Sequence, residues 1–384
     1  MRAAERVARA IACEKPDRIP FIGLNGFALL RSDVLPLNPL TPNSWQPPGS
    51  EYYPHVSNLQ LRFRPYKWKA EQWNPKPPKD WKKWKFSPHK EIDEWGVIWE
   101  VSGKRTMGCP VEGSLKSWDQ LNDLVIPDGS NAERYALFRK IVKLVPRKSK
   151  YRLGTMDTFI FGRTHFLRGW NNYMIDLIRA PQKIQMLIDR ILPFYEGEIH
   201  QLHELGAQAV FAFDDWASQE DVLISPLMFD RIFRDPYKKI INLCHDLGMV
   251  FLLHSCGNIG KFLPKFIEIG IDGVQIDSPH MAGLNVMQKY AGKICFICCV
   301  DIQKVYPNGT TEDVVKEVLT MMNALGNQGG GFIAIDYEEA ETVLKVPKAN
   351  IQTFERTVRK YGHYRPDGTL DKHNWPEWEE KEQQ

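Results

Sequence analysis

Several features that would classify a chain at once are missing from these 384 residues. No apolar run reaches the roughly 18 residues that a membrane-spanning helix needs. Basic and acidic residues nearly balance, 50 against 47, and a net charge of +3 argues against a protein that coats nucleic acid. The N-terminal segment has no apolar h-region of a signal peptide. We therefore expect a cytoplasmic protein with neither a nucleic-acid nor a membrane partner.

The number of cysteines excludes a further class of protein. Seven cysteines, an odd number in a chain of this length, argue against a disulfide framework and for a reducing compartment. Hydrophobic residues make up 43% and charged residues 25%, which excludes a disordered or fibrous chain. The length allows two or three domains, but it fits equally well a single α/β barrel of roughly 250 residues with an extension. These values are typical of an enzyme.

Regular periodicity is missing between residues 30 and 90. The stretch from Leu35 to Lys90 holds eleven prolines and five tryptophans, and no helical or strand period persists in it. A solvated linker would not carry so many tryptophans. We predict that residues 30–90 form an irregular insertion or lid, and that residues 371–384 form a polar tail. The basic cluster Arg62–Lys90 is a candidate docking surface, although such a run is more often a solvated face.

From Tyr151 onward, short apolar runs alternate with helical stretches. The runs cover residues 152–157, 208–215, 249–255, 273–277, 294–301 and 331–336, and the helical stretches cover 181–205, 226–247 and 311–326. Before this region, residues 1–13 are predicted to form a short helix and residues 21–24 a short apolar run. This alternation predicts βα units and a parallel sheet. The runs are apolar on both faces, as in strands buried between helices and a barrel interior. The predicted fold class is α/β, a single (β/α)8 TIM barrel.

Most of these runs end on residues capable of chemistry. These residues are Asp157, Asp214, Asp215, His254, Cys256, Gln275, Asp277, Cys299, Asp301, Asp336 and Glu338. In a (β/α)8 barrel, the C-terminal ends of the strands converge on one mouth, where active sites are built. A single aspartate there is explained equally well as a helix cap, but six such ends together favour an active site. Asp157, Asp214 and Asp215 are candidates for orienting a substrate or donating a proton.

The segment LLHSCGN, residues 252–258, indicates a metal site. In an extended backbone, His254 and Cys256 point the same way, and Zn²⁺ takes nitrogen and sulfur ligands. The pattern alone is weak, because buried cysteine and histidine usually serve packing or hydrogen bonding. Glu338 and Cys299 are alternative third ligands, and we expect Cys295 and Cys298 to pack in the core. Two thiolates would quench the Lewis acidity of the metal more than one thiolate with a carboxylate.

Seven segments of the chain resemble the uroporphyrinogen decarboxylase superfamily, and within it the corrinoid-linked methyltransferases. They are KPDRIP (15–20), DEWGVIW (93–99), ELGAQAVFAFDDWASQ (204–219), LISPLMF (223–229), HDLGMVFLLHSCGNI (245–259), VDIQ (300–303) and VPKAN (346–350). The resemblance implies a TIM barrel with zinc bound by His254 and Cys256 at its mouth. The third ligand of these methyltransferases is commonly a cysteine after the last strand, where this chain has Asp336, Tyr337 and Glu338.

This departure argues against the members that methylate a thiol such as coenzyme M. Porphyrinogen decarboxylation is disfavoured as well, because the segment IGLNGFALL, residues 22–30, replaces the arginine-rich loop of the decarboxylases. Among the remaining members of the superfamily, the chain resembles the O-demethylases. These enzymes move a methyl group from a methoxylated aromatic compound to Co(I) cobalamin on a separate corrinoid protein. A Lewis acid on the ether oxygen makes the phenolate a better leaving group, and a His254, Cys256 and Glu338 site would supply it.

The cobalamin is expected on a partner, because this chain lacks the D-x-H-x-x-G motif. The nearest string, Asp277–Gly283, has one extra residue before its histidine. Four aromatic residues near the predicted mouth would suit a flat ring or core packing equally well: Phe159, Phe161, Trp216 and Tyr337. Two alternatives stay open: a methylcobalamin:thiol methyltransferase with Cys299 as ligand, and a non-catalytic member that binds a corrinoid protein without stoichiometric metal.

Overall fold

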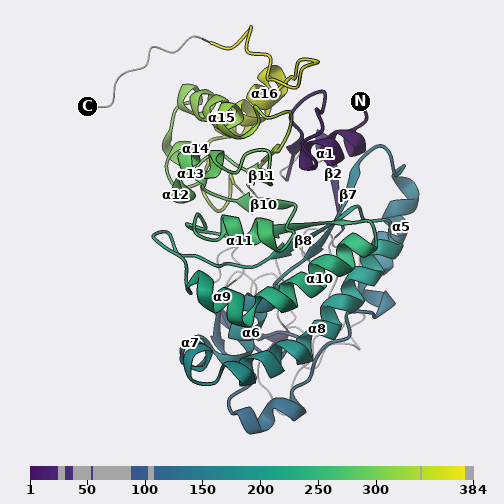
Figure 1. Cartoon of the computed structure of the whole chain (residues 1–384), viewed down its shortest axis with the longest axis vertical. Coiled ribbons are helices and arrows are strands. Elements are labelled where there is room, and N and C mark those ends of the chain that lie inside the picture. Colours follow the sequence, from purple (N-terminus) through teal and green to yellow (C-terminus); the bar gives the residue numbers. More distant parts are fainter. Residues whose placement is uncertain (25–30, 38–52, 55–87, 103–107, 338–339, 377–384) are drawn as a thin grey trace.

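The computed structural model describes the chain except residues 25–30, 38–52, 55–87, 103–107, 338–339 and 377–384 (Figure 1). Eight strands form one sheet in the order β1-β12-β11-β10-β9-β8-β7-β2, and every neighbouring pair is parallel. They are β1 (Phe21–Ile22), β2 (Val34–Leu37), β7 (Tyr151–Met156), β8 (Ala209–Phe213), β9 (Val250–His254), β10 (Gly273–Ile276), β11 (Cys295–Cys298) and β12 (Phe332–Ile335). The fold is the predicted (β/α)8 TIM barrel.

The two end strands of this sheet, β1 and β2, meet at a contact that we call the seam. The amide of Asp33 donates to the carbonyl of Phe21 (2.9 Å), and the amide of Phe21 donates back to the Asp33 carboxylate (3.0 Å). Arg6 and Arg18 bind the same carboxylate, at 2.9 and 3.1 Å. Asp17 in turn pairs with Arg6 at 2.6 Å. The segment KPDRIP therefore supplies charges that hold the barrel closed.

The helices follow the strands and cover the outside of the barrel. They are α1 (Ala3–Ile11), α5 (Ala136–Leu144), α6 (Ile160–Arg168), α7 (Trp170–Arg179), α8 (Pro181–Glu204), α9 (Pro226–Ile232), α10 (Arg234–Asp246), α11 (Leu263–Glu268), α12 (Pro279–Ala282), α13 (Leu284–Gln288), α14 (Val305–Asn308), α15 (Thr311–Leu325) and α16 (Lys348–Tyr361), with two 3₁₀ helices, η2 (Trp118–Asp123) and η3 (Ala132–Tyr135). Figure 1 shows α8 and α10 side by side on the outside of the sheet. No helix in the described part of the chain is long and apolar enough to cross a membrane.

Three of the predicted helices are confirmed with shifts of one or two residues at their ends, whereas the predicted helix 226–247 is two helices, α9 and α10. Pro236 has no amide to donate to the carbonyl of Ile232, so the helix is interrupted at Phe233. The carbonyl of Ile232 accepts instead from the side chain of Gln185 (2.8 Å). The break therefore docks α9 and α10 against α8.

Part of the predicted insertion, residues 30–90, belongs to the barrel. Residues 34–37 form β2, which pairs with β7, and Pro36 is tolerated because β2 lies at the end of the sheet order. Residues 38–52 and 55–87 lie outside the described residues, so the lid and the docking surface at Arg62–Lys90 stay predictions. In the tail, Trp375 donates to the carbonyl of Tyr361 (3.1 Å), and residues 377–384 also lie outside the described part.

A second, four-stranded sheet stands beside the barrel. Its order is β3-β4-β5-β6, with strands β3 (Tyr53–Pro54), β4 (His89–Ile92), β5 (Ile98–Val101) and β6 (Cys109–Glu112). Asp93, between β4 and β5, accepts hydrogen bonds from the amides of Trp95 and Val97 and from the indole of Trp99. Arg163 of α6 contacts the same carboxylate at 3.5 Å and lies over the Trp95 ring. The segment DEWGVIW therefore attaches the small sheet to α6.

Candidate metal centre

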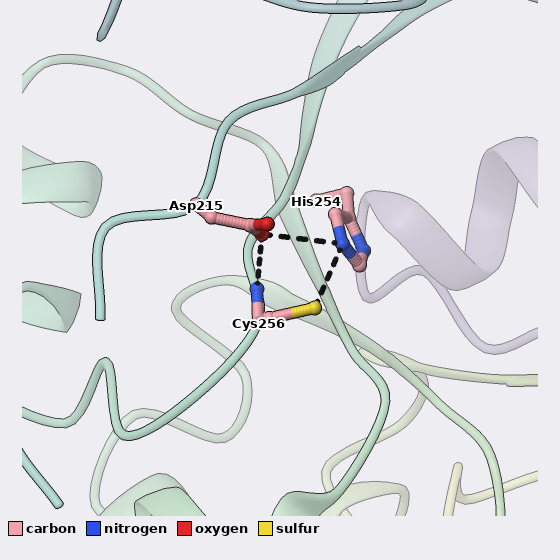
Figure 2. A group of neighbouring side chains, drawn as sticks. All are labelled: Asp215, His254 and Cys256. Atoms are coloured by element: carbon pink, nitrogen blue, oxygen red, sulfur yellow. Dashed lines mark hydrogen bonds and ion pairs between the residues drawn. The ribbon is translucent and has the colours of Figure 1, made fainter. Parts of the chain in front are cut away.

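Three side chains with metal-binding atoms gather at the C-terminal ends of β8 and β9 (Figure 2). The ligand atoms of Asp215, His254 and Cys256 all lie within 4.8 Å of one another. Nε2 of His254 is 3.3 Å from Sγ of Cys256 and 3.5 Å from Oδ1 of Asp215. The Asp215 side chain is 57% exposed and the His254 side chain 12%. The three residues therefore form a compact group, which we call the metal-binding group after the kind of atoms that it offers. Solvent reaches it from the Asp215 side.

The backbone beyond β8 and β9 explains why the three side chains meet. Phe213 and His254 are paired in the parallel sheet, and past that point the amide of Asp214 donates to the carbonyl of His254 (2.9 Å). The amide of Cys256 donates to Oδ1 of Asp215 at 2.8 Å. The two segments thus stay together for two residues after the sheet ends, and the carboxylate of Asp215 is held beside the thiol of Cys256.

The next residue, Gly257, turns the chain away from the site. Its φ of +83° is a backbone conformation that residues with a Cβ rarely adopt. A Cβ there would lie 2.3 Å from the carbonyl oxygen of Ser218 and 2.6 Å from that of Ala217. Only glycine therefore allows the loop after Cys256 to pass so close to the loop after β8.

His254 is oriented by a chain of hydrogen bonds from the neighbouring strand. Its Nδ1 contacts Oε1 of Gln275, and the Gln275 amide nitrogen donates to Oδ1 of Asp277 (2.8 Å). Because Gln275 donates through its nitrogen, its oxygen accepts from Nδ1 of His254. That tautomer leaves the Nε2 lone pair of a neutral His254 directed at Asp215 and Cys256. Such outer partners are the usual means by which proteins orient a metal-binding histidine.

The three groups shift each other's proton affinities. Burial would raise the pKa of Asp215, but the hydrogen bond and charge of His254 and the Cys256 amide lower it to about 2. Burial would lower the pKa of His254, but the negative charges of Cys256 and Asp215 raise it well above its usual value. Burial raises the pKa of Cys256 to about 11, against the attraction of His254. The surroundings of His254 therefore favour a positive charge at its ring.

The donor set fits zinc. Carboxylate oxygen, imidazole nitrogen and thiolate sulfur are all zinc ligands, and metal–ligand bonds of about 2.0–2.3 Å in a tetrahedron separate two ligand atoms by about 3.4–3.6 Å. The separations of 3.3 and 3.5 Å around Nε2 agree with that spacing. Three protein ligands would leave a fourth position on the metal open to a substrate, as in catalytic zinc sites.

The structure separates the three predicted catalytic aspartates. Asp215 joins the metal-binding group, whereas Asp214 is fully buried and its carboxylate accepts hydrogen bonds from the amides of Phe161 and Gly162. Burial raises the pKa of Asp214 to about 7, even though these bonds favour its charged form. Asp157 is exposed at the end of β7. Asp214 is therefore a cap on the first turn of α6, which is the alternative role of a strand-end aspartate.

Two further residues were candidates for the third ligand. Glu338 lies outside the described residues, so its predicted role stays a prediction. Cys299 is buried, and its thiol donates to the backbone carbonyl of Asp277 at 2.9 Å. Cys295 and Cys298 are buried in β11, where core packing was expected.

The four aromatic residues predicted near the mouth fall into a buried set of three and one partly exposed residue. Phe159, Phe161 and Trp216 are fully buried, and Trp216 stacks on Phe161 with 4.3 Å between the ring centroids, so these three serve packing. Tyr337 is half-buried near the metal-binding group. Burial and the charges of Asp277, Cys256 and Cys299 raise its pKa to about 12. Tyr337 is thus the predicted aromatic residue that faces the candidate site.

Gln275 and Asp277 lie at the end of a predicted strand, but the sequence indicated no role for either residue. The signal that identifies them is strand register, because Gln275 pairs with His254 across β10 and β9. Tyr237 was missed altogether, and its hydroxyl donates to the buried carboxylate of Asp214. It lies on α10, far from any apolar run that ends at the mouth, so no local pattern marks it.

The chain is similar to several known proteins. The family model described as uroporphyrinogen decarboxylase (URO-D) matches residues 100–361. The methylcobamide:CoM methyltransferase MtbA of Methanosarcina acetivorans is 23% identical over 60% of this chain, and the match spans 65% of the relative, just under two thirds of its length. The enzyme of the same name from Methanosarcina mazei is 22% identical over 65% of this chain and 69% of its own.

Among solved structures, a methyltransferase from Methanosarcina mazei shares the fold. It superposes with a TM-score of 0.61 at 14% identity and covers 94% of this chain and 99% of its own. The family match extends over more than half of the chain and includes β7 to β12 and all three residues of the metal-binding group. The chain therefore belongs to the uroporphyrinogen decarboxylase family, in the branch that contains corrinoid-dependent methyltransferases.

Proposed function

We propose that this protein moves a methyl group from a methoxylated aromatic compound to the Co(I) cobalamin of a partner corrinoid protein, using zinc held by Asp215, His254 and Cys256. The observation that carries the proposal is the mixed donor set, in which a carboxylate and one thiolate accompany the imidazole. Such a set leaves the metal more acidic than two thiolates would. Asp215 takes the place that we had expected Glu338 to fill, and the chemical reasoning is the same.

In the proposed reaction, the bond between the methyl carbon and the ether oxygen breaks while a bond between carbon and cobalt forms. The two electrons of Co(I) make the new bond, and the phenolate leaves with the electrons of the old one. Zinc bound at the site would supply a Lewis acid that stabilises the negative charge growing on the ether oxygen. The protein's own residues keep the ligands in place: Gln275 orients His254, and the amide of Cys256 fixes Asp215.

The partner and the compartment are parts of the same proposal. The corrinoid would be supplied by a separate protein that docks over the barrel mouth, because both named relatives act on methylcobamide. Asp215, the most exposed of the three ligands, faces that approach. We place the reaction in the cytoplasm, where free cysteines such as Cys256 stay reduced.

A second candidate is a methylcobalamin:thiol methyltransferase, which the names of the two relatives favour. There, a thiolate attacks the methyl group of methylcobalamin and leaves Co(I). A thiolate substrate gains nucleophilicity at a metal with little residual positive charge, which favours thiolate-rich sites. Cys299, the sulfur ligand that this candidate would recruit, instead bonds to the carbonyl of Asp277. We therefore rank it second.

The deciding experiment offers purified protein a Co(I) corrinoid and a panel of methoxylated aromatics, and follows the cobalamin spectrum. Zinc-dependent formation of methylcobalamin would support the proposal. Methyl transfer from methylcobalamin to a thiol, with no transfer from any aryl ether, would favour the second candidate. Absence of stoichiometric metal and of turnover would indicate a non-catalytic member that binds a corrinoid protein.

Cys256→Ala provides the matched test of the metal site. The small side chain removes the sulfur ligand and leaves the amide that holds Asp215, so the barrel should stay folded. We expect zinc content and methyl transfer both to fall to background, measured by metal analysis and by the same spectral assay. Cys298→Ala, in the core of β11, is the control and should retain zinc. Full activity of Cys256→Ala would exclude the proposed zinc mechanism.

A further inference from the structure

Asp214 is an unusual neighbour for a metal ligand because it is buried and saturated with hydrogen-bond donors. Its side chain accepts from the amides of Phe161 (2.8 Å) and Gly162 (2.6 Å) and from the hydroxyl of Tyr237. A Cβ on Gly162 would lie 3.0 Å from the same carboxylate, so glycine keeps this approach open. The carboxylate therefore connects β8 to the first turn of α6 and to α10.

The segment 214–216 connects this buried carboxylate to the metal-binding group. The amide of Asp214 donates to the carbonyl of His254, and the amide of Trp216 donates to Oγ of Ser255 (2.9 Å). Between them, Asp215 receives the amide of Cys256. The segment 214–216 is thus bonded at every residue to the segment 254–256, and the buried carboxylate anchors its first residue to two helices.

The anchor matters because Asp215 itself has little other support. Its side chain is 57% exposed, and the described structure restrains it through the Cys256 amide and its contact with His254. An exposed carboxylate samples several rotamers, so its distance from Nε2 depends on where its backbone is held. Outer partners that fix such ligands commonly change metal affinity by about 10- to 100-fold.

We propose that Asp214 and Tyr237 are positioning residues of the metal centre: they hold the backbone of Asp215 so that its carboxylate completes the site with His254 and Cys256. The inference rests on the metal site of the proposed function. It assigns a task to Tyr237, which lies on α10 and is connected to the site through its hydrogen bond to Asp214.

Tyr237→Phe tests the assignment. It removes the hydroxyl and keeps the ring, which packs edge-on against Phe159 with 4.8 Å between centroids. We expect zinc affinity, measured by competition with a chromophoric chelator, to fall by about 10- to 100-fold. With Co²⁺ in place of zinc, the visible d–d bands should weaken as the tetrahedral geometry is lost. Both readouts are made without substrate or corrinoid.

A matched control exists on the other side of the barrel. The hydroxyl of Tyr306 donates to the buried carboxylate of Asp336 at 2.7 Å, which is the same pair of groups at the end of β12. Tyr306→Phe should cost similar stability in urea unfolding and leave zinc affinity unchanged. It also tests Glu338, because the segment that follows Asp336 carries that candidate ligand.

The outcomes separate the inference from the proposed function. Weaker zinc binding in Tyr237→Phe alone supports the inference. Unchanged binding in Tyr237→Phe, or equal weakening in both variants, overturns it while the zinc site of the wild-type protein stands. Weakening in Tyr306→Phe alone overturns it as well and moves the third ligand to Glu338. A wild-type protein that binds no zinc overturns the proposed metal function and the inference together.

Discussion

At the scale of single residues, the neighbours Asp214 and Asp215 show how far two identical side chains can diverge. Asp214 is buried, and burial raises its pKa to about 7. Asp215 is only partly removed from solvent, and the hydrogen bond and charge of His254 outweigh the opposing effect of this partial burial and lower its pKa to about 2. Consecutive side chains on an extended backbone point to opposite sides, so one of the pair turns toward α6 and the other toward the mouth.

The different surroundings of Asp214 and Asp215 could not be predicted from the sequence, whereas part of the site could. His254 and Cys256 were predicted because their spacing of two residues places them on one side of a strand. Asp215 was predicted to act at the mouth, but its contact with them depends on how β8 pairs with β9. Gln275 depends on register in the same way. Local spacing predicts which residues share a face, and pairing between strands decides which of them touch.

Gly257 offers a residue-scale test of how the loop after the ligands is built. In Gly257→Ala, the positive φ alone costs about 1–2 kcal/mol. The collision of the new Cβ with the carbonyls of Ser218 and Ala217 should add at least about 1 kcal/mol. Gly248→Ala is the matched control, because its φ of +71° is similar and a Cβ there meets nothing within 4 Å. Urea unfolding measures both, and equal losses would refute the close-approach argument.

At the scale of elements, long periodic segments were the most predictable. The predicted strands 152–157, 208–215 and 249–255 correspond to β7, β8 and β9, and the helix 181–205 to α8. The strand β2 was missed, because it is four residues long, contains Pro36 and lies in a proline-rich stretch. Pairing with β7 sets the position of this strand, and the residues of β2 alone do not predict a strand.

The first turn of α15 provides a test at this scale. Thr310 accepts from the amide of Asp313 (3.1 Å), and Asp313 accepts from the amide of Thr310 (2.8 Å), which is a capping box. Thr310→Ala should lower the free energy of unfolding by about 1 kcal/mol. Thr320→Ala, on the exposed side of the same helix, should be neutral or slightly stabilising, because alanine is the better helix former. Chemical denaturation of both variants measures these changes in the free energy of unfolding, and equal losses would contradict the role of the cap.

At the scale of the whole molecule, a buried group of charges joins the small sheet to the barrel. Arg134 of η3 forms two bonds to the carboxylate of Glu94, beside β4, and Glu198 of α8 lies in the same environment. Burial raises the pKa of Glu198 to about 8, although the positive charges of Arg134 and Arg163 oppose this. Glu198 therefore carries a proton in the folded protein at neutral pH.

This proton predicts how stability depends on pH. In the unfolded chain, Glu198 has a pKa near 4.5, so the folded protein binds the extra proton between about pH 4.5 and 8. Its contribution is complete below the unfolded pKa and is lost as the pH rises through the folded pKa. Glu198→Gln keeps the shape without the titration, so its stability relative to wild type should rise from pH 5.5 to pH 9. Urea unfolding at both values checks this, and parallel curves would contradict it.

The position of the seam has a consequence for how the barrel tolerates motion. The sheet order places β9 and β10, which carry His254 and Gln275, diametrically opposite the junction of β1 and β2. A barrel opens locally most easily where the hydrogen bonds between neighbouring strands are interrupted. In this barrel that place is the seam, which is held by Asp33. Fraying of the chain's first strands would therefore begin half a circumference away from the chemistry. Local opening at the seam should therefore leave the positions of His254 and Gln275 undisturbed.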